Sequence, residues 1–575
     1  MSARSINSVF LLICFLFSLQ ISFINADLPV HCLKHQIVGS WDLFLTAPVT
    51  KDPDQRVTCD HDSPDSPRTS HLAMKDGFSA SKNLQLDLHN DDSVKEQGQN
   101  SGESFWTMIY DEGFEIRHNG IRYFSFSEYV QTSGGFKSKC SETLVGWYHN
   151  YNTNEKGCFK AQKVGTGSSD LTQNVKQAYV VEPDYVQVKH QEKEKEKKKT
   201  EKLEKKSEKE EKAVKKLHRK NKRANDDSDE NFFSYLHKKD DQTDITEVIN
   251  FKQIDSLQNK VSERLNKNVN KKWVAGVHKK FEGYNLAQLN MMAGRRKSGF
   301  VLVDEAAESF NSFLETERIY SVDVTDLPKS FDWHDSLKGP RSQGDCGSCY
   351  IFATLAMLQA RLKIHYEEDV VLSVQHSINC NFYNQGCDGG YPFLVEKYAN
   401  EYGLVDDKCS SYKASNGHCG DVCDISELEK IYHVKDYRFI GGSYGKSNER
   451  EMMLELQKNG PIVVSFEPSY DFMYYQSGIY HSVNAAEWIL KGEDKPEWEK
   501  VDHSVLCYGW GEEDGEKFWM LQNTWGSDWG ESGFFRMRRG TDESHIESLA
   551  EAADPIIKTN NYIFKEKKSK VFLDY

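Results

Sequence analysis

The alternation of hydrophobic and polar positions is clearest near the start of the chain. Across residues 27–170, short aromatic and β-branched runs recur between polar turns, as is typical of an all-β unit. The segment 113–123, GFEIRHNGIRY, carries Asn119 and Gly120 between two such runs. An Asn-Gly pair in this setting is the strongest short-range signal for a β-hairpin. The pattern therefore predicts an all-β unit with a hairpin that turns at these two residues.

A different periodicity follows in residues 230–326, where apolar positions recur at helical spacing. The clearest of these positions are Ile254, Leu257, Val261 and Leu265. The segment ends near a basic cluster, Arg295-Arg296-Lys297. A cleavable helical segment in front of a further domain is typical of a propeptide. From Leu327 onward the chain becomes rich in Gly, Cys, Trp and Tyr, which indicates a new domain.

A highly charged stretch separates these two regions. Residues 189–223 consist mainly of Lys and Glu and contain almost no apolar side chains. Such a composition cannot bury a core. One interpretation is a basic docking segment; the other is a solvated linker or a frayed charged helix. We favour the linker.

The first residues show the order of features found in a secretory signal. Arg4 supplies a positive charge, residues 9–19 form an apolar run, and Ala26 is a small residue suited to cleavage. A membrane anchor is the alternative, but the apolar run is shorter than the ~20 residues that span a bilayer. No later segment is long and apolar enough to span. We therefore expect cleavage after Ala26, with Asp27 as the new first residue, and entry into the secretory pathway.

Composition narrows the possible partners. The formal net charge of −15 argues against nucleic acid as a partner. Of thirteen cysteines, Cys14 leaves with the signal, and twelve in an exported chain favour disulfides over metal ligands. No Cys/His cluster has zinc spacing, so no metal is predicted. The sequence contains no Asn-x-Ser/Thr site, so it offers no attachment site for the N-glycans on which some sorting pathways depend.

The segment 343–350, QGDCGSCY, carries the decisive chemistry. It matches the C-G-[SA]-C-[WY] pattern around the nucleophile of papain-like proteases. Apolar residues recur at helical spacing after the second cysteine, namely Phe352, Leu355, Ala356 and Leu362. We therefore expect Cys349 to begin an amphipathic helix, whose N-terminus stabilises a thiolate and lowers the cysteine pKa.

A nucleophilic cysteine needs a base and a residue that orients that base. His503 stands at the head of an apolar strand, and Asn523 precedes a Trp-Gly turn. They lie 154 and 174 residues beyond Cys349, more than the about 130–150 usual for this arrangement. The difference predicts a loop insertion, for which the acidic segment 484–500 is the candidate.

The chemistry assigns a role to each of these residues. His503 pairs with Cys349 as an imidazolium and then protonates the leaving amine. Asn523 holds the imidazole in the productive tautomer. Gln343 and the backbone N–H of Cys349 can donate to the tetrahedral oxyanion. Trp525 is expected to cover the His–Asn hydrogen bond and to exclude water.

These motifs resemble the papain family of cysteine proteases over residues 327–557. Tyr350, where most such enzymes have Trp, and the runs 538–543 and 546–548 are similar to the dipeptidyl peptidase I (cathepsin C) family. So are the N-terminal segments 39–41, 113–116 and 163–166. The resemblance implies an α+β fold in which an all-β, barrel-like exclusion domain and a propeptide precede a peptidase domain of two halves. The expected boundaries are 1–26 for the signal peptide, 27–170 for the exclusion domain, 171–326 for the propeptide and linker, 327–557 for the peptidase and 558–575 for the tail.

The same resemblance implies a cysteine exopeptidase that removes dipeptides from free N-termini of peptides and proteins. In that family the exclusion domain blocks the far end of the cleft, and its terminal carboxylate, here Asp27, binds the substrate α-ammonium group. Gly389 and Gly390 should line the non-primed subsites, where Gly allows substrate backbone to approach closely. The implied partners are such substrates and activating proteases, in a lysosome-like or other acidic vesicle or outside the cell. The family's tetramers do not transfer automatically to a chain with a longer linker.

The resemblance also implies disulfides and a ligand. The implied pairs are Cys32–Cys140, Cys59–Cys158, Cys346–Cys387, Cys380–Cys419 and Cys409–Cys423. Cys507 is then a buried thiol on an apolar strand. The family's chloride site uses two tyrosine hydroxyls, but the matching positions here are Phe393 and Phe439, which cannot donate a hydrogen bond. We therefore expect no cofactor and doubt a dependence on chloride.

Two other functions fit parts of the sequence. A papain-like endopeptidase with an N-terminal inhibitory or targeting domain is the main alternative. A non-enzymatic scaffold is disfavoured by the intact Cys349, His503, Asn523 and Gln343. Whether the mature N-terminus stays bound after activation separates the first alternative from the exopeptidase.

Overall fold

The computed structural model of the protein describes three parts of the chain. They are residues 30–165 (without 53–54, 60, 62–63, 65–79, 97–103 and 133–134), short stretches between 259 and 292, and residues 323–559 (without 424–427 and 484–502). The predicted signal peptide, Asp27, the Lys/Glu stretch, the basic cluster at 295–297, the candidate insertion and the C-terminal tail after Thr559 lie outside the described residues. Within the described residues, no helix has the length and apolarity that a membrane crossing requires.

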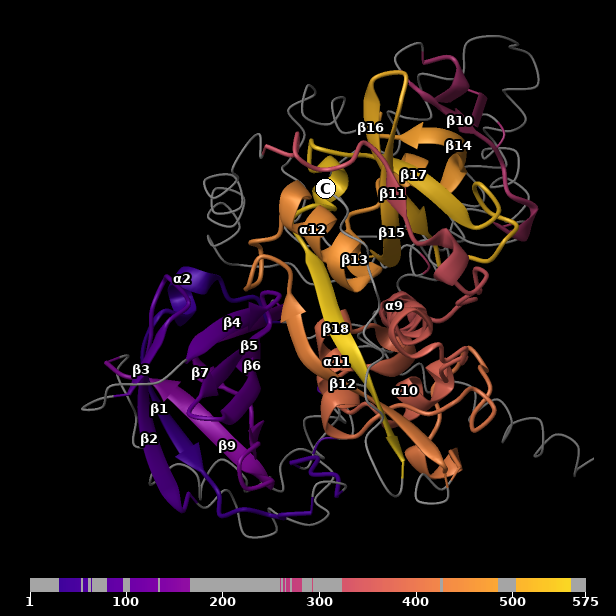
Figure 1. Cartoon of the computed structure of the whole chain (residues 1–575). Helices are drawn as coiled ribbons and strands as arrows, with labels where there is room; N and C mark the ends of the chain where they lie inside the picture. Colours follow the sequence, from indigo (N-terminus) through magenta and orange to yellow (C-terminus); the bar gives the residue numbers. More distant parts are fainter. Residues whose placement is uncertain are drawn as a thin grey trace, which may run out of the picture. The chain divides into compact units, whose positions relative to one another are not determined.

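The N-terminal part is a β-barrel preceded by one short helix, α2 (Lys34–Ile37) (Figure 1). Its strands are β1 (Gly39–Leu45), β2 (Lys82–Leu88), β3 (Val94–Glu96), β4 (Phe105–Ile109), β5 (Gly113–His118), β6 (Ile121–Thr132), β7 (Gly135–Thr143), β8 (Gly146–Asn150) and β9 (Glu155–Lys163). They pair in the order β3-β2-β1-β9-β7-β6-β5-β4, and β8 pairs with both β6 and β9. These pairings close β6, β7, β9 and β8 into a ring, which confirms the barrel-like prediction.

The predicted hairpin is the β5–β6 pair. His118 faces Ile121 across the pair, and the turn is made by Asn119 and Gly120 at φ values of 51° and 77°. Two successive positive φ values are the requirement that makes Asn-Gly the preferred sequence for such a turn. The prediction is confirmed down to the turn residues.

Alternating burial forms the barrel core. Along β1, Trp41, Leu43 and Leu45 are buried while the residues between them are partly exposed. The Trp41 ring lies 5.2 Å from that of Phe114 on β5. Because side chains of a strand alternate between its two faces, this pattern directs every second residue into the barrel.

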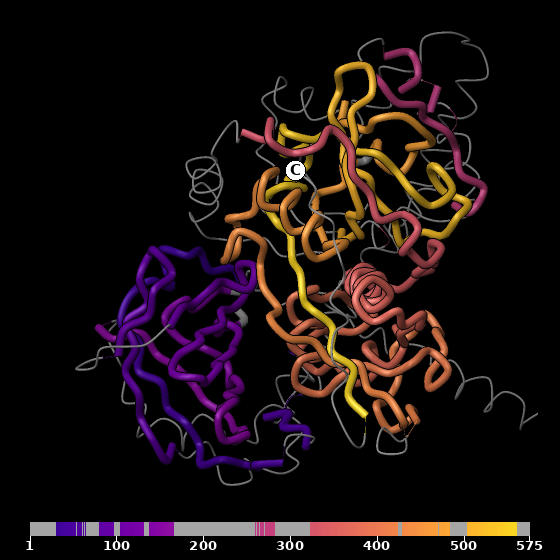
Figure 2. The backbone as a smooth tube through the Cα atoms, in the orientation of Figure 1, coloured from indigo at the N-terminus to yellow at the C-terminus, as the bar shows by residue number. Residues whose placement is uncertain are grey.

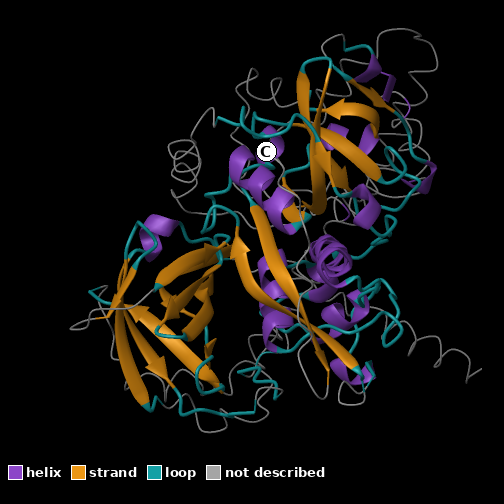
Figure 3. Ribbon diagram, viewed as in Figure 1, coloured by secondary structure: helices purple, strands orange, loops and turns teal. Residues whose placement is uncertain are grey.

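The described residues of the predicted peptidase part combine four α-helices with a second sheet (Figure 3). The helices are α9 (Cys349–Tyr366), α10 (Val374–Cys380), α11 (Pro392–Glu401) and α12 (Glu449–Asn459). The strands are β11 (Phe331–Asp332), β12 (Lys430–Phe439), β13 (Ile462–Phe466), β14 (Tyr475–Tyr480), β15 (His503–Glu513), β16 (Glu516–Gln522), β17 (Phe534–Arg538) and β18 (Ala550–Thr559). In Figure 1, α9, α10 and α11 lie together in one half, and β14 to β17 lie in the other. β18 extends to Thr559, two residues past the expected domain end.

The helix predicted to begin at Cys349 is α9, but it is not amphipathic. Its residues from Cys349 to Leu362 are buried apart from Ala356. The helix packs against α10 and α11 and against β13, β15 and β18, so it has neighbours on nearly every side. The prediction of a helix is confirmed, and the prediction of a solvent-facing side is wrong because the helix lies at the centre of the domain.

Part of the predicted propeptide belongs to the peptidase sheet. The short strand β10 (Trp273–Ala275) pairs with β14, so that the sheet order is β10-β14-β17-β16-β15-β13-β18-β12. The Trp273 indole also donates to the carbonyl oxygen of His481 at 2.9 Å. In the backbone tube of Figure 2 this segment runs along the outside of the sheet. The predicted helical spacing upstream is described only at Leu265, which is helical and buried.

Buried charges join the barrel to the peptidase part. Glu115 of β5 accepts a hydrogen bond from the Tyr437 hydroxyl at 2.7 Å and lies 3.7 Å from the Lys397 ammonium group. Lys397 in turn pairs with Glu401 at 2.7 Å. Burial alone would raise the pKa of Glu401, but the charges of Lys397 and His149 and the hydrogen bonds from Lys397 and Tyr383 together lower that pKa to about 2. The two parts therefore meet through buried ionised groups, and removing one of them would leave its partner as an uncompensated buried charge.

Candidate active site

The loop before α9 is fixed by the side chain of Gln343. Its amide nitrogen donates to the carbonyl oxygen of Cys346 at 2.9 Å, and its amide oxygen accepts from the Thr524 hydroxyl. The hydroxyl of Tyr412 donates to the Gln343 carbonyl at 2.6 Å. Since an amide nitrogen carries two hydrogens, one remains for the role of oxyanion donor. Gln343 is buried and held in place beside the nucleophile's loop.

Cys349 is the first residue of α9 and is buried. Among the described cysteines, it and Cys507 are the two outside the disulfides. The positive end of the helix dipole favours a thiolate at this position. Cys507, by contrast, lies within β15, where burial raises its pKa to about 12. Of the two thiols, only Cys349 has surroundings that favour the reactive form.

His503 begins β15, which packs against α9. Its Nε2 donates to the Asn523 side-chain oxygen at 2.8 Å, as the predicted roles require. The other ring nitrogen, Nδ1, is buried and has no hydrogen-bond partner among the described residues. Burial lowers the pKa of His503 to about 4. A thiolate facing Nδ1 would reverse this effect, because an adjacent negative charge favours the imidazolium.

Aromatic rings cover the His503–Asn523 pair. The Trp525 ring lies 5.1 Å from the imidazole at an angle of 34°, and it is completely buried. Two further rings, which the sequence interpretation did not identify, complete the cover. Phe466 meets the imidazole edge-on at 5.7 Å, and Trp529 meets Trp525 at 5.0 Å. A second Trp four residues after the first was the one signal in the sequence for this cover.

The Trp525 indole also contacts the predicted propeptide. Its N–H donates to the carbonyl oxygen of Met292 at 3.0 Å, and its ring lies 6.0 Å from Phe281. Met292 is buried. These contacts place residues ahead of the predicted peptidase domain directly on the aromatic cover of His503, the candidate catalytic histidine.

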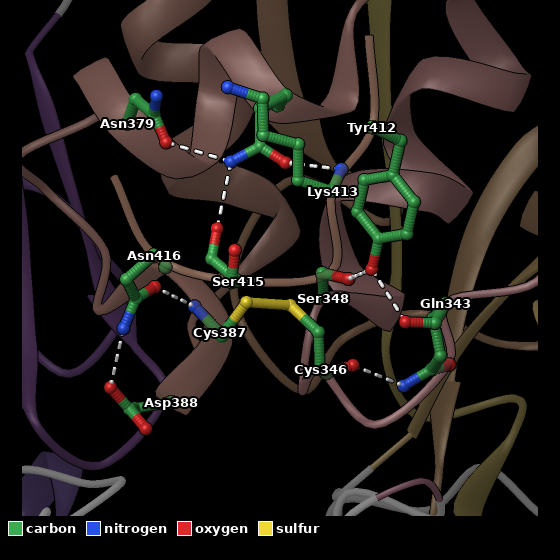
Figure 4. The surroundings of a disulfide bond; sticks show 12 residues. Gln343, Cys346, Ser348, Asn379, Cys387, Asp388, Tyr412, Lys413, Ser415 and Asn416 are labelled. Carbon is green, nitrogen blue, oxygen red and sulfur yellow. Dashed lines mark hydrogen bonds between the residues drawn. A yellow bond between two sulfur atoms is a disulfide. The ribbon is translucent and has the colours of Figure 1, made fainter. Parts of the chain in front are cut away.

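The Cys346–Cys387 disulfide ties the nucleophile's loop to the glycine loop (Figure 4). The backbone N–H of Cys387 donates to the Asn416 side chain at 2.7 Å, and the Gly347 N–H donates to the Cys387 carbonyl at 2.7 Å. The Tyr350 hydroxyl donates to the carbonyl of Gly386 at 2.9 Å, which gives a structural reason for Tyr at this position. Together these bonds fix the wall that the substrate backbone would follow.

Gly389 and Gly390 follow this disulfide and have φ values of 122° and 154°. A Cβ atom on Gly390 would lie 2.5 Å from the Asn384 side-chain oxygen. Both glycines are therefore required by the local backbone, in addition to the predicted role in substrate approach.

All five implied disulfides are present. They are Cys32–Cys140, Cys59–Cys158, Cys346–Cys387, Cys380–Cys419 and Cys409–Cys423. Among the described residues, no group of His, Cys, Asp or Glu side chains is arranged to hold a metal ion.

We expect Cys346→Ala to destabilise the protein by ~2–5 kcal/mol, because it opens a disulfide between two loops of the site. Urea unfolding of the proform measures this loss. The double variant Cys346→Ala/Cys387→Ala, which removes the thiol left behind, should be destabilised to a similar extent. A Cys346→Ala variant as stable as the wild type and devoid of activity would instead make Cys346 the nucleophile.

Comparison with known proteins agrees with this geometry. Residues 327–553 match the papain family cysteine protease domain, and residues 27–163 match the cathepsin C exclusion domain. Cathepsin C of Schistosoma mansoni is 35% identical over 50% of this chain and 63% of its own length. Dipeptidyl aminopeptidase 1 of Plasmodium falciparum is 29% identical over 41% of this chain and 45% of its own. The chain thus spans about half to two thirds of the length of these two relatives.

Further similarity extends over nearly complete smaller proteins. Cathepsin B-like CP2 of Giardia intestinalis is 30% identical over 50% of this chain and 90% of its own length. A solved structure of digestive procathepsin L 3 from the Tenebrio molitor larval midgut shares 22% identity, covers 56% of this chain and 96% of its own, and gives a TM-score of 0.39.

The fold and the Cys–His–Asn site define a cysteine peptidase with a papain-like domain of two halves. The chain belongs to the papain family of cysteine proteases, and it carries in addition an N-terminal exclusion domain of the cathepsin C type.

Proposed function

We propose that the protein is a cysteine exopeptidase that removes dipeptides from free N-termini of peptides and proteins. The observation that carries this proposal is the position of the exclusion domain, which packs against the peptidase part. Its Tyr110 ring lies 4.4 Å from Tyr391, the residue that follows Gly390. A barrel at this end of the glycine loop limits how many substrate residues fit before the scissile bond.

The reaction uses the groups of the site in two steps. The Cys349 thiolate attacks the carbonyl carbon of the second peptide bond, and the oxyanion accepts from the Gln343 amide and the Cys349 N–H. The His503 imidazolium protonates the leaving amine, and the C–N bond breaks to leave a thioester. His503 then removes a proton from water, which attacks the thioester and releases the dipeptide. Asn523 keeps the ring oriented throughout.

Blocking the substrate amine tests the proposal. A dipeptidyl-coumarin substrate should be cleaved, and its N-acetylated twin should not, because a site that pairs the α-ammonium group leaves a buried carboxylate unpaired when the charge is removed. The measurement is kcat/KM for both, with the active enzyme counted by a thiol-reactive titrant. Equal turnover of the two substrates would support the endopeptidase alternative.

Activation by another protease fits the contacts of the N-terminal segments. Met292 and β10 lie on the peptidase part in the described chain. Cleavage between these segments and the mature domain would uncover Trp525. The acidic vesicle or extracellular location remains part of the same proposal, and it relies on the predicted signal peptide.

A chloride ion does not fit the position that the family resemblance assigns to it. Phe393 and Phe439 are stacked with ring centroids 4.7 Å apart and offer no hydroxyl. The backbone N–H of Phe393 donates instead to the carboxyl of Glu551, which faces Phe439 across the β12–β18 pair. The buried carboxyl of Glu551 accepts the Phe393 N–H, so this donor is not available to an anion. A carboxyl group at this position also disfavours binding of a negative ion.

We therefore expect activity to be insensitive to chloride. Dialysis into acetate or sulfate at constant ionic strength should leave kcat/KM within about twofold of its value in chloride, since a change of this size corresponds to less than about 0.5 kcal/mol. A steep loss that added chloride restores would show that other donors build an anion site.

A further inference from the structure

Two glutamates are buried together near the glycine loop, Glu396 on α11 and Glu551 on β18, and neither is more than 1% exposed. One oxygen of Glu551 accepts a hydrogen bond from the Tyr110 hydroxyl at 3.0 Å, and its carboxyl also accepts the Phe393 N–H. The second Glu551 oxygen and both Glu396 oxygens have no hydrogen-bond partner among the described residues. We call these two residues the acidic pair. It presents three buried acceptors that are not satisfied.

Within the described part of the chain, the acidic pair makes no ion pair with a cation of its own. Arg361 and Arg438 are the basic residues whose charges act on Glu396. Both already donate to the Glu455 carboxylate, at 2.8 Å and 2.6 Å. Burial raises the pKa of both members of the pair, that of Glu551 to about 8. A buried carboxyl that is not satisfied within the protein takes up a proton, binds water or binds a ligand, and the open oxygens of this pair are available to a cationic ligand.

The pair lies on a line of polar contacts that starts beside the catalytic histidine. Ser504, which follows His503, contacts the Ser465 hydroxyl at 2.9 Å, and Ser465 lies 3.4 Å from the hydroxyl of Tyr110. Tyr110 then reaches Glu551. Three successive side-chain contacts thus connect the strand of His503 to the acidic pair.

The line is bordered by aromatic rings. The Tyr110 ring contacts the rings of Tyr391, at 4.4 Å, and Tyr444, at 5.4 Å. Phe439 contacts both Tyr444 and Phe393. Leu549, two positions before Glu551 in the chain, is also buried. These surfaces suit a flexible aliphatic stem, and aromatic faces attract a cation at its tip.

We propose that Glu551, together with Glu396, is a specificity-determining pair that selects a lysine or arginine side chain on the substrate's N-terminal residue. The cationic group of that side chain is the missing partner, because it donates hydrogen bonds to the unsatisfied carboxyl oxygens. Its positive charge also favours the ionised form of the carboxyl groups. A neutral side chain of the same length would leave these oxygens unsatisfied. The inference rests on the proposed function, in which the N-terminal residue is the second before the scissile bond.

Two dipeptidyl-coumarin substrates test the pair, one beginning with lysine and one with norleucine, which has the same stem without the ammonium group. We expect the wild type to prefer lysine by about 10- to 100-fold in kcat/KM, and Glu551→Gln to lose the preference. Glu512→Gln is the matched control, because Glu512 on β15 is ion-paired with Lys329 at the surface and its change removes the same formal charge. The control should keep the wild-type ratio. A wild type that prefers norleucine, or a Glu551→Gln variant that keeps the lysine preference, overturns the proposal.

Two further measurements keep the test decisive. If Glu551→Gln does not fold, Glu396→Gln is compared in the same way, and the wild-type ratio by itself can still overturn the proposal. N-acetylated versions of both substrates distinguish a failure of the proposed lysine preference from a failure of the proposed dipeptidyl function. Equal cleavage of free and acetylated substrates would contradict the dipeptidyl function, while the lysine-to-norleucine ratio within the acetylated set would still report on the acidic pair.

Discussion

Replacement of Cys349 by alanine is expected to abolish turnover, because no other described cysteine combines a helix N-terminus with a position beside the His503 strand. Loss of the nucleophile typically costs several orders of magnitude in kcat and leaves only residual catalysis from the other groups of the site. The measurement is hydrolysis of a dipeptidyl-coumarin substrate together with thermal unfolding of the variant. The folded state should be retained.

Cys507→Ala provides the matched control. Cys507 is the other thiol outside the disulfides among the described residues, and it is buried in β15. This variant should keep its activity and its reaction with a thiol alkylator, apart from a modest loss of stability from the vacated volume. Activity in the Cys349 variant together with inactivity in the Cys507 variant would reverse the assignment.

Replacement of Asp27 by asparagine should lower kcat/KM for dipeptidyl substrates by about 1.5 to 3.5 orders of magnitude. The reason is that the substrate ammonium group loses its carboxylate partner, and truncating one partner of a buried charge pair costs roughly 2–5 kcal/mol. Asp27 lies outside the described residues, so the prediction relies on cleavage after Ala26 and on the family resemblance. N-terminal sequencing of the active enzyme checks the first of these.

The control for this variant is the reactivity of Cys349. Since the terminal carboxylate only anchors the substrate, a small thiol alkylator should react at the wild-type rate. Unchanged dipeptidyl cleavage in Asp27→Asn would show that the substrate amine is recognised by another group.

The candidate catalytic residues stand out in the sequence because their chemistry restricts both residue type and local context. A cysteine before helical spacing, a histidine at the head of an apolar strand and an Asn before Trp-Gly leave few alternatives, and the structure brings His503 and Asn523 to 2.8 Å. The Asn119-Gly120 hairpin was predictable for a similar reason, since its signal is entirely local. The disulfide pairs came only with the family resemblance.

Features that depend on several distant segments could not be predicted in this way. The periodicity of α9 suggested a solvent-facing side, but the packing of three strands and two helices around it buries that side. The acidic pair brings together α11, β18 and the barrel residue Tyr110, which are far apart in the chain. Glu396 and Glu551 look like ordinary surface charges in sequence, because nothing local marks them as buried.

The pairing of β10 with β14 has a consequence for the enzyme once the N-terminal segment has left. The backbone groups of Ser477 and Gly478 that face Val274 and Trp273 then lose their partners. An uncovered edge strand is a template for pairing with another chain, and proteins protect such edges with charge, twist or a covering segment. Removal of this segment by the proposed processing would therefore turn a paired border of the sheet into an open edge, at which a strand of a second copy of the enzyme can pair.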